Sequence, residues 1–441
     1  MQQTHAARCG MAGAIALAMA SLTATPTQAQ VATPLLDALI SPNAYGGGIA
    51  YQPGVTVTSR ARPEYDSSGV SLGNVVVRPQ LSESVGYESN VLATRKAQGS
   101  SVVETNASLD ASSNWSNNGV RAALSVDDVR YPSLSLQSYT NWTASLGGVY
   151  EIGRDVLSVA YSHLALTETP GSLGTPQLQQ PLPFTIDLGS VGYRINFSRL
   201  YVTPSVLVAS YKYSNGTFGG VTFQQSFQDR LVVSPSVTVG YELSPQRNLV
   251  MVVRDSNANY TNTLAGFGSL NYNDIAVLGG FDYDADGVIR YRALVGYEER
   301  SFQNAQFKTI DAPVFEASAI WTPTGLTTVT GAVGRLIQAS SNTSSTTYTE
   351  TYGQLRVDHE YLPNVLLRAD LGAYLADYTA GGGTQVYYTA GVGVTYLLNR
   401  NMQVAASYDF IGSQSNASGT NPVFGQSYTD NRVFLTLRVG L

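Results

Sequence analysis

Apolar and polar residues alternate along most of this chain. In the last segment, 431–441, one parity is apolar throughout, with Val433, Leu435, Leu437, Val439 and Leu441, and the other is mixed, with Phe434, Thr436, Arg438 and Gly440. Successive side chains of a β-strand point to opposite faces, so this pattern predicts a strand with one oily face. The same alternation appears in 230–242, 288–298 and 313–321.

Eighteen such strands are predicted after Asn74. They span 75–88, 101–113, 119–131, 138–151, 155–168, 184–196, 199–213, 229–242, 248–260, 272–283, 288–301, 312–322, 326–338, 347–360, 364–378, 386–397, 402–411 and 428–441. Every second connection is short and rich in turn formers, such as "SPQR" and "LPN", and the others are longer. This alternation is typical of outer-membrane barrels. The fold class predicted for 74–441 is therefore all-β: a transmembrane, antiparallel, up-and-down β-barrel of eighteen strands, or sixteen if one hairpin is misread.

Composition narrows the class further. Charged residues make up 13% of the chain, about half the usual share, whereas there are 42 Gly and 28 Tyr. After the N-terminal leader the sequence has no apolar run of 18 residues, which argues against a membrane-spanning helix. This mixture disfavours both an ordinary soluble enzyme and a helical membrane protein.

The first 29 residues have the layout of a signal peptide. A short head with Arg8 precedes an apolar run from Met11 to Leu22, and Thr27 and Ala29 form a small-residue cleavage site. We therefore expect export and a location in the outer membrane of a Gram-negative bacterium. Cleavage removes the single cysteine, Cys9, and leaves 24 basic and 31 acidic residues, net −7. That balance disfavours nucleic acid as a partner.

Residues 30–73 do not alternate. They contain Pro34, Pro42, Pro53 and Pro63, and are predicted to be a periplasmic N-terminal extension, mostly irregular. The stretch "TPLLDALI" would form one short helix. Three roles stay open for the extension: a plug of the barrel mouth, a contact with a partner, or a disordered tail.

The tetrapeptide "VGYE" occurs three times, and its tyrosines are Tyr87, Tyr241 and Tyr297. Each ends an apolar face, as Trp321 does in "PVFEASAIW". Because a tyrosine body suits lipid and its hydroxyl suits water, these four residues are predicted to form aromatic girdles at the two membrane interfaces. The glycine is expected to face the lumen, and the acid to begin the polar connection.

Arginines occupy many of the strand positions that alternate with the apolar, lipid-facing ones, and they indicate how the lumen is charged. Parity and strand direction place nine arginines in the lower or middle half of the inner wall, with two acids among them: Arg78, Arg121, Arg194, Arg254, Arg290, Arg292, Glu316, Arg356, Arg368, Asp370 and Arg438. One interpretation is a positive zone that selects anions, since rings of Arg or Lys do so in pores. The other is that the arginines pair with lumen acids and pack the wall. The net negative charge is expected mainly on loops and turns.

Catalytic and metal chemistry find little support. "DYDADG" (282–287) begins like a calcium loop, but Ala293 stands where that loop needs a bidentate Glu, so a hairpin turn is favoured. The mature chain has two histidines, His163 near the outer end of one strand and His359 near the periplasmic end of another. They cannot share a site. We expect no cofactor, no metal and no enzymatic activity, with a barrel hydrolase as the alternative.

The chain resembles the putative β-barrel porin 2 family of outer-membrane proteins. The resemblance rests on "TVTSRARPEYDSSGVSLGNVVVRPQLSESVGYESNVLATR" near the front, and at the back on "TVTGAVGRLIQ", "VDHEYLPNVLLRADLGAYLADY", "YYTAGVGVTYLLNRNMQVAASYDF" and "DNRVFLTLRVGL". It covers about 55–441. It implies the barrel fold, the outer membrane and an association with exopolysaccharide or capsule genes. It also implies assembly by the barrel assembly machinery, although Leu441 stands where such proteins commonly end in Phe.

Three functions follow from this reading. The first is a porin-like channel for passive diffusion of small solutes, anionic ones among them. The second is an accessory barrel for exopolysaccharide or capsule export, which would need lumen aromatics arranged for sugar stacking and a partner at the extension. The third is a plugged structural or adhesive barrel that binds through loops such as 169–183 and 412–427. Outer-membrane lipid and lipopolysaccharide are expected partners of all three, and a homo-oligomer stays open.

Overall fold

The computed structural model describes residues 55–115, 118–174, 179–218, 221–263, 266, 268–283, 288–340, 347–378, 383–416 and 427–441. No helix within these ranges is long and apolar enough to cross a membrane. The signal peptide 1–29, "TPLLDALI" and the turn 284–287 lie outside the described residues.

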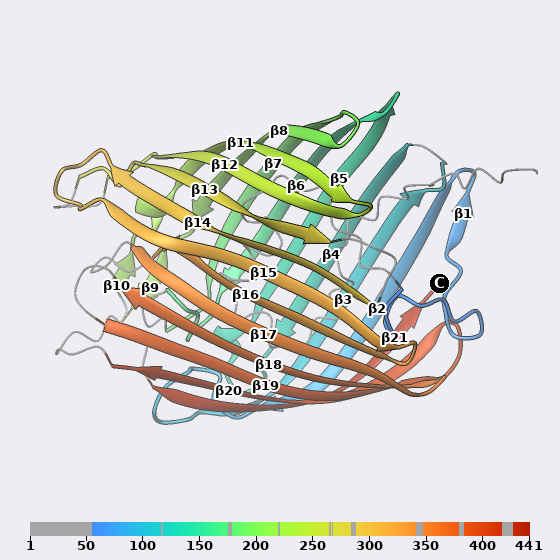
Figure 1. The fold of residues 1–441 in the computed structure, drawn as a ribbon. Coiled ribbons are helices and arrows are strands. Elements are labelled where there is room, and N and C mark those ends of the chain that lie inside the picture. Colours follow the sequence, from blue (N-terminus) through green and yellow to red (C-terminus); the bar gives the residue numbers. More distant parts are fainter. Residues whose placement is uncertain are drawn as a thin grey trace, which may run out of the picture.

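Eighteen long antiparallel strands form a closed barrel (Figure 1). They are β2 (Val75–Glu88), β3 (Ser100–Ser113), β4 (Gly119–Arg130), β5 (Tyr139–Ile152), β6 (Asp155–Glu168), β7 (Leu182–Asn196), β8 (Leu200–Tyr213), β11 (Arg230–Ser244), β12 (Arg247–Tyr260), β13 (Tyr272–Tyr283), β14 (Ile289–Phe302), β15 (Ile310–Thr324), β16 (Thr327–Ala339), β17 (Thr347–Leu362), β18 (Val365–Tyr378), β19 (Gly383–Leu397), β20 (Met402–Ser415) and β21 (Tyr428–Gly440). Each pairs with its neighbours in sequence, and β2 pairs with β21 to close the cycle. The predicted fold and the count of eighteen are confirmed.

Strand ends differ from the prediction mainly on the outer side. β19 begins at Gly383 rather than at 386, and β20 continues to Ser415 rather than ending at 411. These added residues are small or polar on both faces, as in "GSQS". Pairing therefore continues beyond the point at which the apolar alternation that marks a strand in the sequence has faded.

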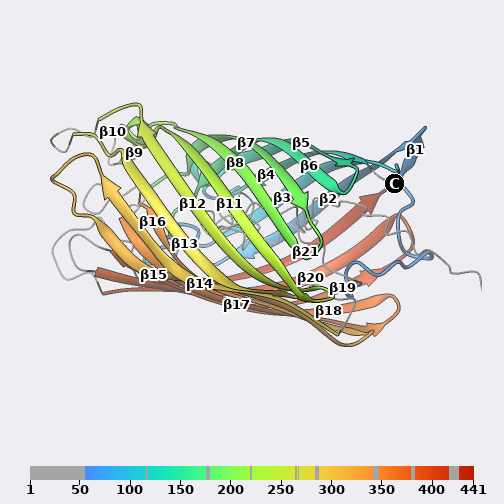
Figure 2. The same ribbon diagram turned by 45° about the horizontal axis from the view of Figure 1, so that its top comes forward.

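Short elements decorate both ends. β9 (Gly216–Phe218) and β10 (Val221–Phe223) form a hairpin in the connection after β8, and short 3-10 turns are η2 (Ser135–Gln137) and η3 (Ser226–Gln228). Both ribbon views place β9 and β10 at the end of the barrel opposite the C-terminus, and β1 (Val70–Leu72) beside the C-terminus (Figures 1 and 2). The last strand, β21, runs from the extracellular side toward the periplasm. The end of the barrel that holds the C-terminus and β1 is therefore the periplasmic end.

β1 lies within the predicted N-terminal extension and adds to the barrel wall. It pairs with the start of β2, from Val70 opposite Val77 to Leu72 opposite Val75, through a tight turn in which Gly73 has φ +64°. The partner strand on that side, β21, reaches β2 only from Gln80 onward. β1 therefore covers an edge that the C-terminus leaves open, and an open edge would invite pairing with another chain.

Candidate functional site: the barrel lumen

Alternation sorts the strand residues into a lipid face and a lumen face. The four aromatic residues predicted for the girdles, Tyr87, Tyr241, Tyr297 and Trp321, all point outward and are 43–54% exposed. Tyr87 and Tyr297 lie toward the outer end of their strands, and Tyr241 and Trp321 toward the periplasmic end. The Tyr297 hydroxyl donates to Asp311 on the next strand. The ring can thus remain in lipid while its hydroxyl is satisfied at the polar edge.

The "VGYE" glycines are required by close neighbours on the lumen side. A Cβ on Gly86 would collide with the Val433 carbonyl oxygen, and one on Gly296 would collide with that of Val277. A Cβ on Gly240 would overlap the Tyr201 ring. Glycine within a strand marks such close approach. The motif therefore combines an outward valine and tyrosine with a glycine at a crowded inner position.

The prediction for the acid of this motif is wrong in two of the three copies. Glu88 and Glu298 do not begin a polar connection but face the lumen, each 1% exposed. Glu88 lies 2.7 Å from Arg432, and Glu298 lies 3.5 Å from Arg254. The reason is parity, since the residue after an outward tyrosine points inward for as long as the strand continues.

The predicted lumen arginines all lie on inward-facing strand positions, and four of them have a carboxylate partner. These ion pairs are Arg121–Asp110 at 2.6 Å, Arg254–Glu298 at 3.5 Å, Arg292–Glu316 at 3.6 Å and Arg368–Asp370 at 2.7 Å. Both predicted lumen acids, Glu316 and Asp370, are therefore paired. Arg290 faces inward two residues before Arg292 on β14.

Four other arginines have no acid within ion-pair distance among the described residues: Arg78, Arg194, Arg356 and Arg438. Arg78 donates to the Ser112 hydroxyl, and Arg194 donates to Asn196 and lies 3.8 Å from the centre of the Tyr201 ring. None of these guanidiniums is in direct contact with a carboxylate, although Asp110 lies opposite Arg78 and Asp370 lies opposite Arg356 on the neighbouring strands. Both interpretations of the arginine pattern thus apply, to different residues.

Acidic residues are common on the inner wall as well as in loops and turns. Strand parity places many acids on the inner wall, including Glu104, Asp110, Asp127, Asp274, Asp358, Asp409 and Asp430. Carboxylates are the natural partners of buried guanidiniums, because a charge that leaves water must be paired or hydrogen-bonded. The lumen wall is therefore strongly charged, with both signs interspersed.

Three inward-facing arginines in the outer half were missed by the sequence analysis. Arg432 is 2% exposed and binds both Glu88 and Asp430 at 2.7 Å. Arg300 binds Asp274 at 2.7 Å and covers the Tyr272 ring, with 4.1 Å to its centroid. Arg230 lies 4.1 Å from the centroid of Tyr211. Their positions along the strands have the parity of the lumen face, so the sequence already contained the information needed to place them there.

The inner wall also carries apolar and aromatic residues. One buried cluster comprises Val250, Val252, Ala276, Leu278, Leu294 and Val314, all on inward positions of β12–β15. Aromatic side chains line the inner wall from β7 to β14. The ring of Phe184 stacks on that of Tyr213, with 5.2 Å between the centroids, and the ring of Tyr272 contacts that of Phe302, with 6.0 Å between the centroids. On the facing wall, Tyr352 stacks on Tyr374 at 6.3 Å. These residues share the inward parity of the lumen arginines, but apolar character alone does not distinguish an inner position from a lipid-facing one.

The outer half of the lumen is crossed by a loop. Residues 169–174 of the β6–β7 loop leave the barrel at β6 and pack on the wall around β17, nine strands away in a cycle of eighteen. Leu173 is 3% exposed and lies in a cluster with Tyr348, Tyr374 and Tyr387. The Ser340 hydroxyl donates to the Gly174 carbonyl at 2.9 Å. The loop therefore reaches the opposite side and narrows the passage.

The β2–β3 loop (89–99) joins it there. Ala93 is fully buried in the same cluster, and a Cβ on Gly171 would lie 2.6 Å from the Ala93 Cβ. Asn90 binds backbone carbonyls of Thr94 and Thr429, which holds this loop against β21. The β2–β3 and β6–β7 loops, which are far apart in the sequence, thus meet inside the barrel.

Both histidines point outward. His163 Nδ1 lies 2.7 Å from Asp187 Oδ1, and the His163 ring contacts the Trp142 ring in a tilted arrangement, with 4.7 Å between their centroids. His359 Nδ1 lies 3.0 Å from the Thr327 hydroxyl at the other end of the barrel. Within the described ranges, no group of three or more His, Cys, Asp or Glu residues is arranged to hold a metal ion.

Solved structures of similar fold include Pseudomonas aeruginosa OpdO (13% identity, 83% of this chain and 98% of that one, TM-score 0.42). Others are P. aeruginosa OccK2 (11%, 83% and 98%, 0.44) and Acinetobacter baumannii OccAB2 (10%, 83% and 98%, 0.44). The curated proteins contain no match.

The family model described as "Putative beta-barrel porin 2" matches residues 62–441. This range contains all eighteen barrel strands and the short strand β1. The chain therefore belongs to the putative beta-barrel porin 2 family of outer-membrane proteins.

Proposed function

We propose that this protein is a passive, non-enzymatic channel of the outer membrane for small solutes, including anions. The observation that carries the proposal is the inner wall: a closed eighteen-strand barrel whose lumen face holds charged and polar side chains. A barrel of this size encloses an aqueous passage unless loops fill it. Delivery by a cleaved signal peptide, 1–29, and folding by the barrel assembly machinery belong to the same proposal.

Anion preference would come from the unpaired arginines. Arg78, Arg356 and Arg438 lie on β2, β17 and β21, toward the periplasmic half of the wall. An anion that reaches them meets a guanidinium that is not in direct contact with a carboxylate. The paired arginines would contribute less, because each is offset by the acid beside it.

A double substitution of Arg290 and Arg292 by serine tests whether the charge of the lumen wall filters ions at all. It removes two positive charges and leaves Glu316 without its guanidinium partner, 3.6 Å away. We expect the reversal potential in a potassium chloride gradient to shift toward cation preference. The matched control, Glu316→Gln, removes one negative charge from the same pair and should shift it the opposite way. Equal reversal potentials for both variants and the wild type would contradict a charge-filtered lumen.

Polysaccharide export is the second candidate, favoured by the inner aromatic rings. Tyr352 and Tyr374 stack on one wall, and Phe184 and Tyr213 on the other. Aromatic faces suit sugar rings as well as one another. Under this candidate, soluble acidic oligosaccharides should block the ionic current, and Tyr352→Ala should weaken the block. If oligosaccharides do not change the current, the export candidate is contradicted and only the diffusion channel remains.

A further inference from the structure

The segment 55–72 spans part of the periplasmic mouth. At one end, β1 pairs with β2. At the other end, residues 56–62 contact β16 and β17. In the closed cycle, β17 and β2 are five strands apart, which corresponds to about 24 Å along the wall at ~4.8 Å per strand. The segment therefore bridges two distant parts of the rim.

Residues 56–62 of this segment make specific contacts with the lumen wall. The backbone N–H of Val57 donates to the Thr328 hydroxyl at 2.9 Å, and Val57 is 1% exposed. Thr328 faces inward, because Val333 on the same strand has the opposite parity and is exposed outside. The Arg60 guanidinium also donates to the Gly325 carbonyl in the turn between β15 and β16, at 2.9 Å. The segment thus lies against the inside of the wall.

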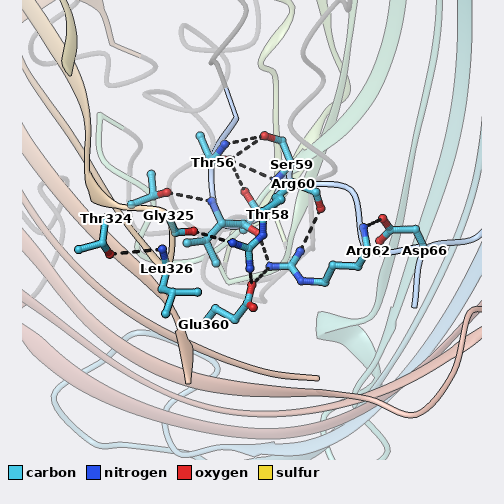
Figure 3. Close-up of polar contacts among 12 residues, drawn as sticks. Thr56, Thr58, Ser59, Arg60, Arg62, Asp66, Thr324, Gly325, Leu326 and Glu360 are labelled. Carbon is cyan, nitrogen blue, oxygen red and sulfur yellow. Dashed lines mark hydrogen bonds and ion pairs between the residues drawn. The ribbon is translucent and has the colours of Figure 1, made fainter. Parts of the chain in front are cut away.

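Two arginines converge on one carboxylate (Figure 3). Arg62 lies 2.6 Å from Glu360 Oε2, and Arg60 binds the same oxygen. Glu360 is 6% exposed and Arg62 is 9% exposed, so both are largely shielded from water. Without the carboxylate, two neighbouring guanidiniums would repel each other in a partly dry site. The docking of the segment consequently depends on Glu360.

We infer that residues 55–72 form a strap that partly closes the periplasmic mouth, with Glu360 as its anchor. This inference rests on the proposed channel function and adds a control element to it. The strap covers the lumen face of β16 and β17 when Arg60 and Arg62 hold Glu360. Loss of that anchor frees residues 56–62 from the wall, while β1 stays paired with β2.

Thiol labelling measures the strap directly and needs no conduction. In a mature chain with Thr328→Cys as its single cysteine, a membrane-impermeant maleimide added from the periplasmic side should react slowly. Adding Glu360→Gln should speed the reaction about tenfold or more, because charge-assisted hydrogen bonds are worth at least that factor. Glu151→Gln is the matched control: it neutralises an exposed acid at the periplasmic end of β5, away from the strap, and should leave the rate unchanged. Ser318→Cys, an exposed inward position on β15, should label fast in every background.

Conductance of the same variants then tests the consequence. With Glu360→Gln, larger single-channel steps than the wild type would support partial closure by the strap. Equal labelling of the Thr328→Cys chain with and without Glu360→Gln would overturn the strap. Faster labelling without any change in the current of a conducting barrel would overturn its role in closure. If no variant conducts, the proposed channel fails, and the labelling rates still decide whether the strap covers the wall.

Discussion

Replacing Leu173 by aspartate is expected to raise the single-channel conductance severalfold. Leu173 anchors the β6–β7 loop among tyrosines of the opposite wall and is 3% exposed. Losing its burial alone costs about 2 kcal/mol, a factor of about 30 in the docking equilibrium. A carboxylate in that cluster would also lack a positive partner. The loop should leave the wall, and the passage through the outer half should widen.

Leu136→Asp is the control for this experiment. Leu136 lies on the β4–β5 loop and is 70% exposed, so the same change of residue there removes no packing. Its conductance should match the wild type. Unchanged conductance for Leu173→Asp, in a barrel that still shows heat-modifiable migration, would mean that the β6–β7 loop does not limit the current.

Arg432→Met is expected to cause the largest loss of stability, about 3–5 kcal/mol. Arg432 is the shared partner of Glu88 and Asp430, and all three are at most 2% exposed. The substitution retains apolar volume but leaves two buried carboxylates facing each other. The pair also joins β21 to β2 at the seam where the barrel closes. Unfolding by urea in detergent micelles, followed by tryptophan fluorescence, measures the change.

Arg130→Met provides the comparison. Arg130 pairs with Asp128 on the outer surface and is 52% exposed, and exposed pairs contribute less than about 1 kcal/mol. A midpoint near that of the wild type is therefore expected. If Arg432→Met were as stable as Arg130→Met, the buried network would not hold the seam.

The barrel was predictable because its signal is local. Each strand repeats an apolar residue every second position over about ten residues, as in Val433 to Leu441, and each turn has its own formers. The inward parity of Arg290 or Arg368 follows from the same count. The sequence could therefore assign faces without knowing which strand lies beside which.

Pairing partners could not be predicted in this way. Arg432 and Glu88 are 344 residues apart and meet only because β21 closes on β2. Leu173 reaches Tyr348 only because its loop bends inward, and its local sequence does not encode that direction. Leu294 has the inward parity of Arg290, but its burial depends on apolar neighbours from β12, β13 and β15 that the local sequence does not give. These features depend on closure and packing rather than on local periodicity.

Single-channel recording in planar bilayers tests the central claim most directly. The purified wild-type barrel and the Leu173→Asp variant would be recorded in a potassium chloride gradient. A passive channel predicts stable, stepwise currents for the wild type, larger steps for the variant and a reversal potential on the anion side. A folded barrel that carries no current in either form would contradict the channel.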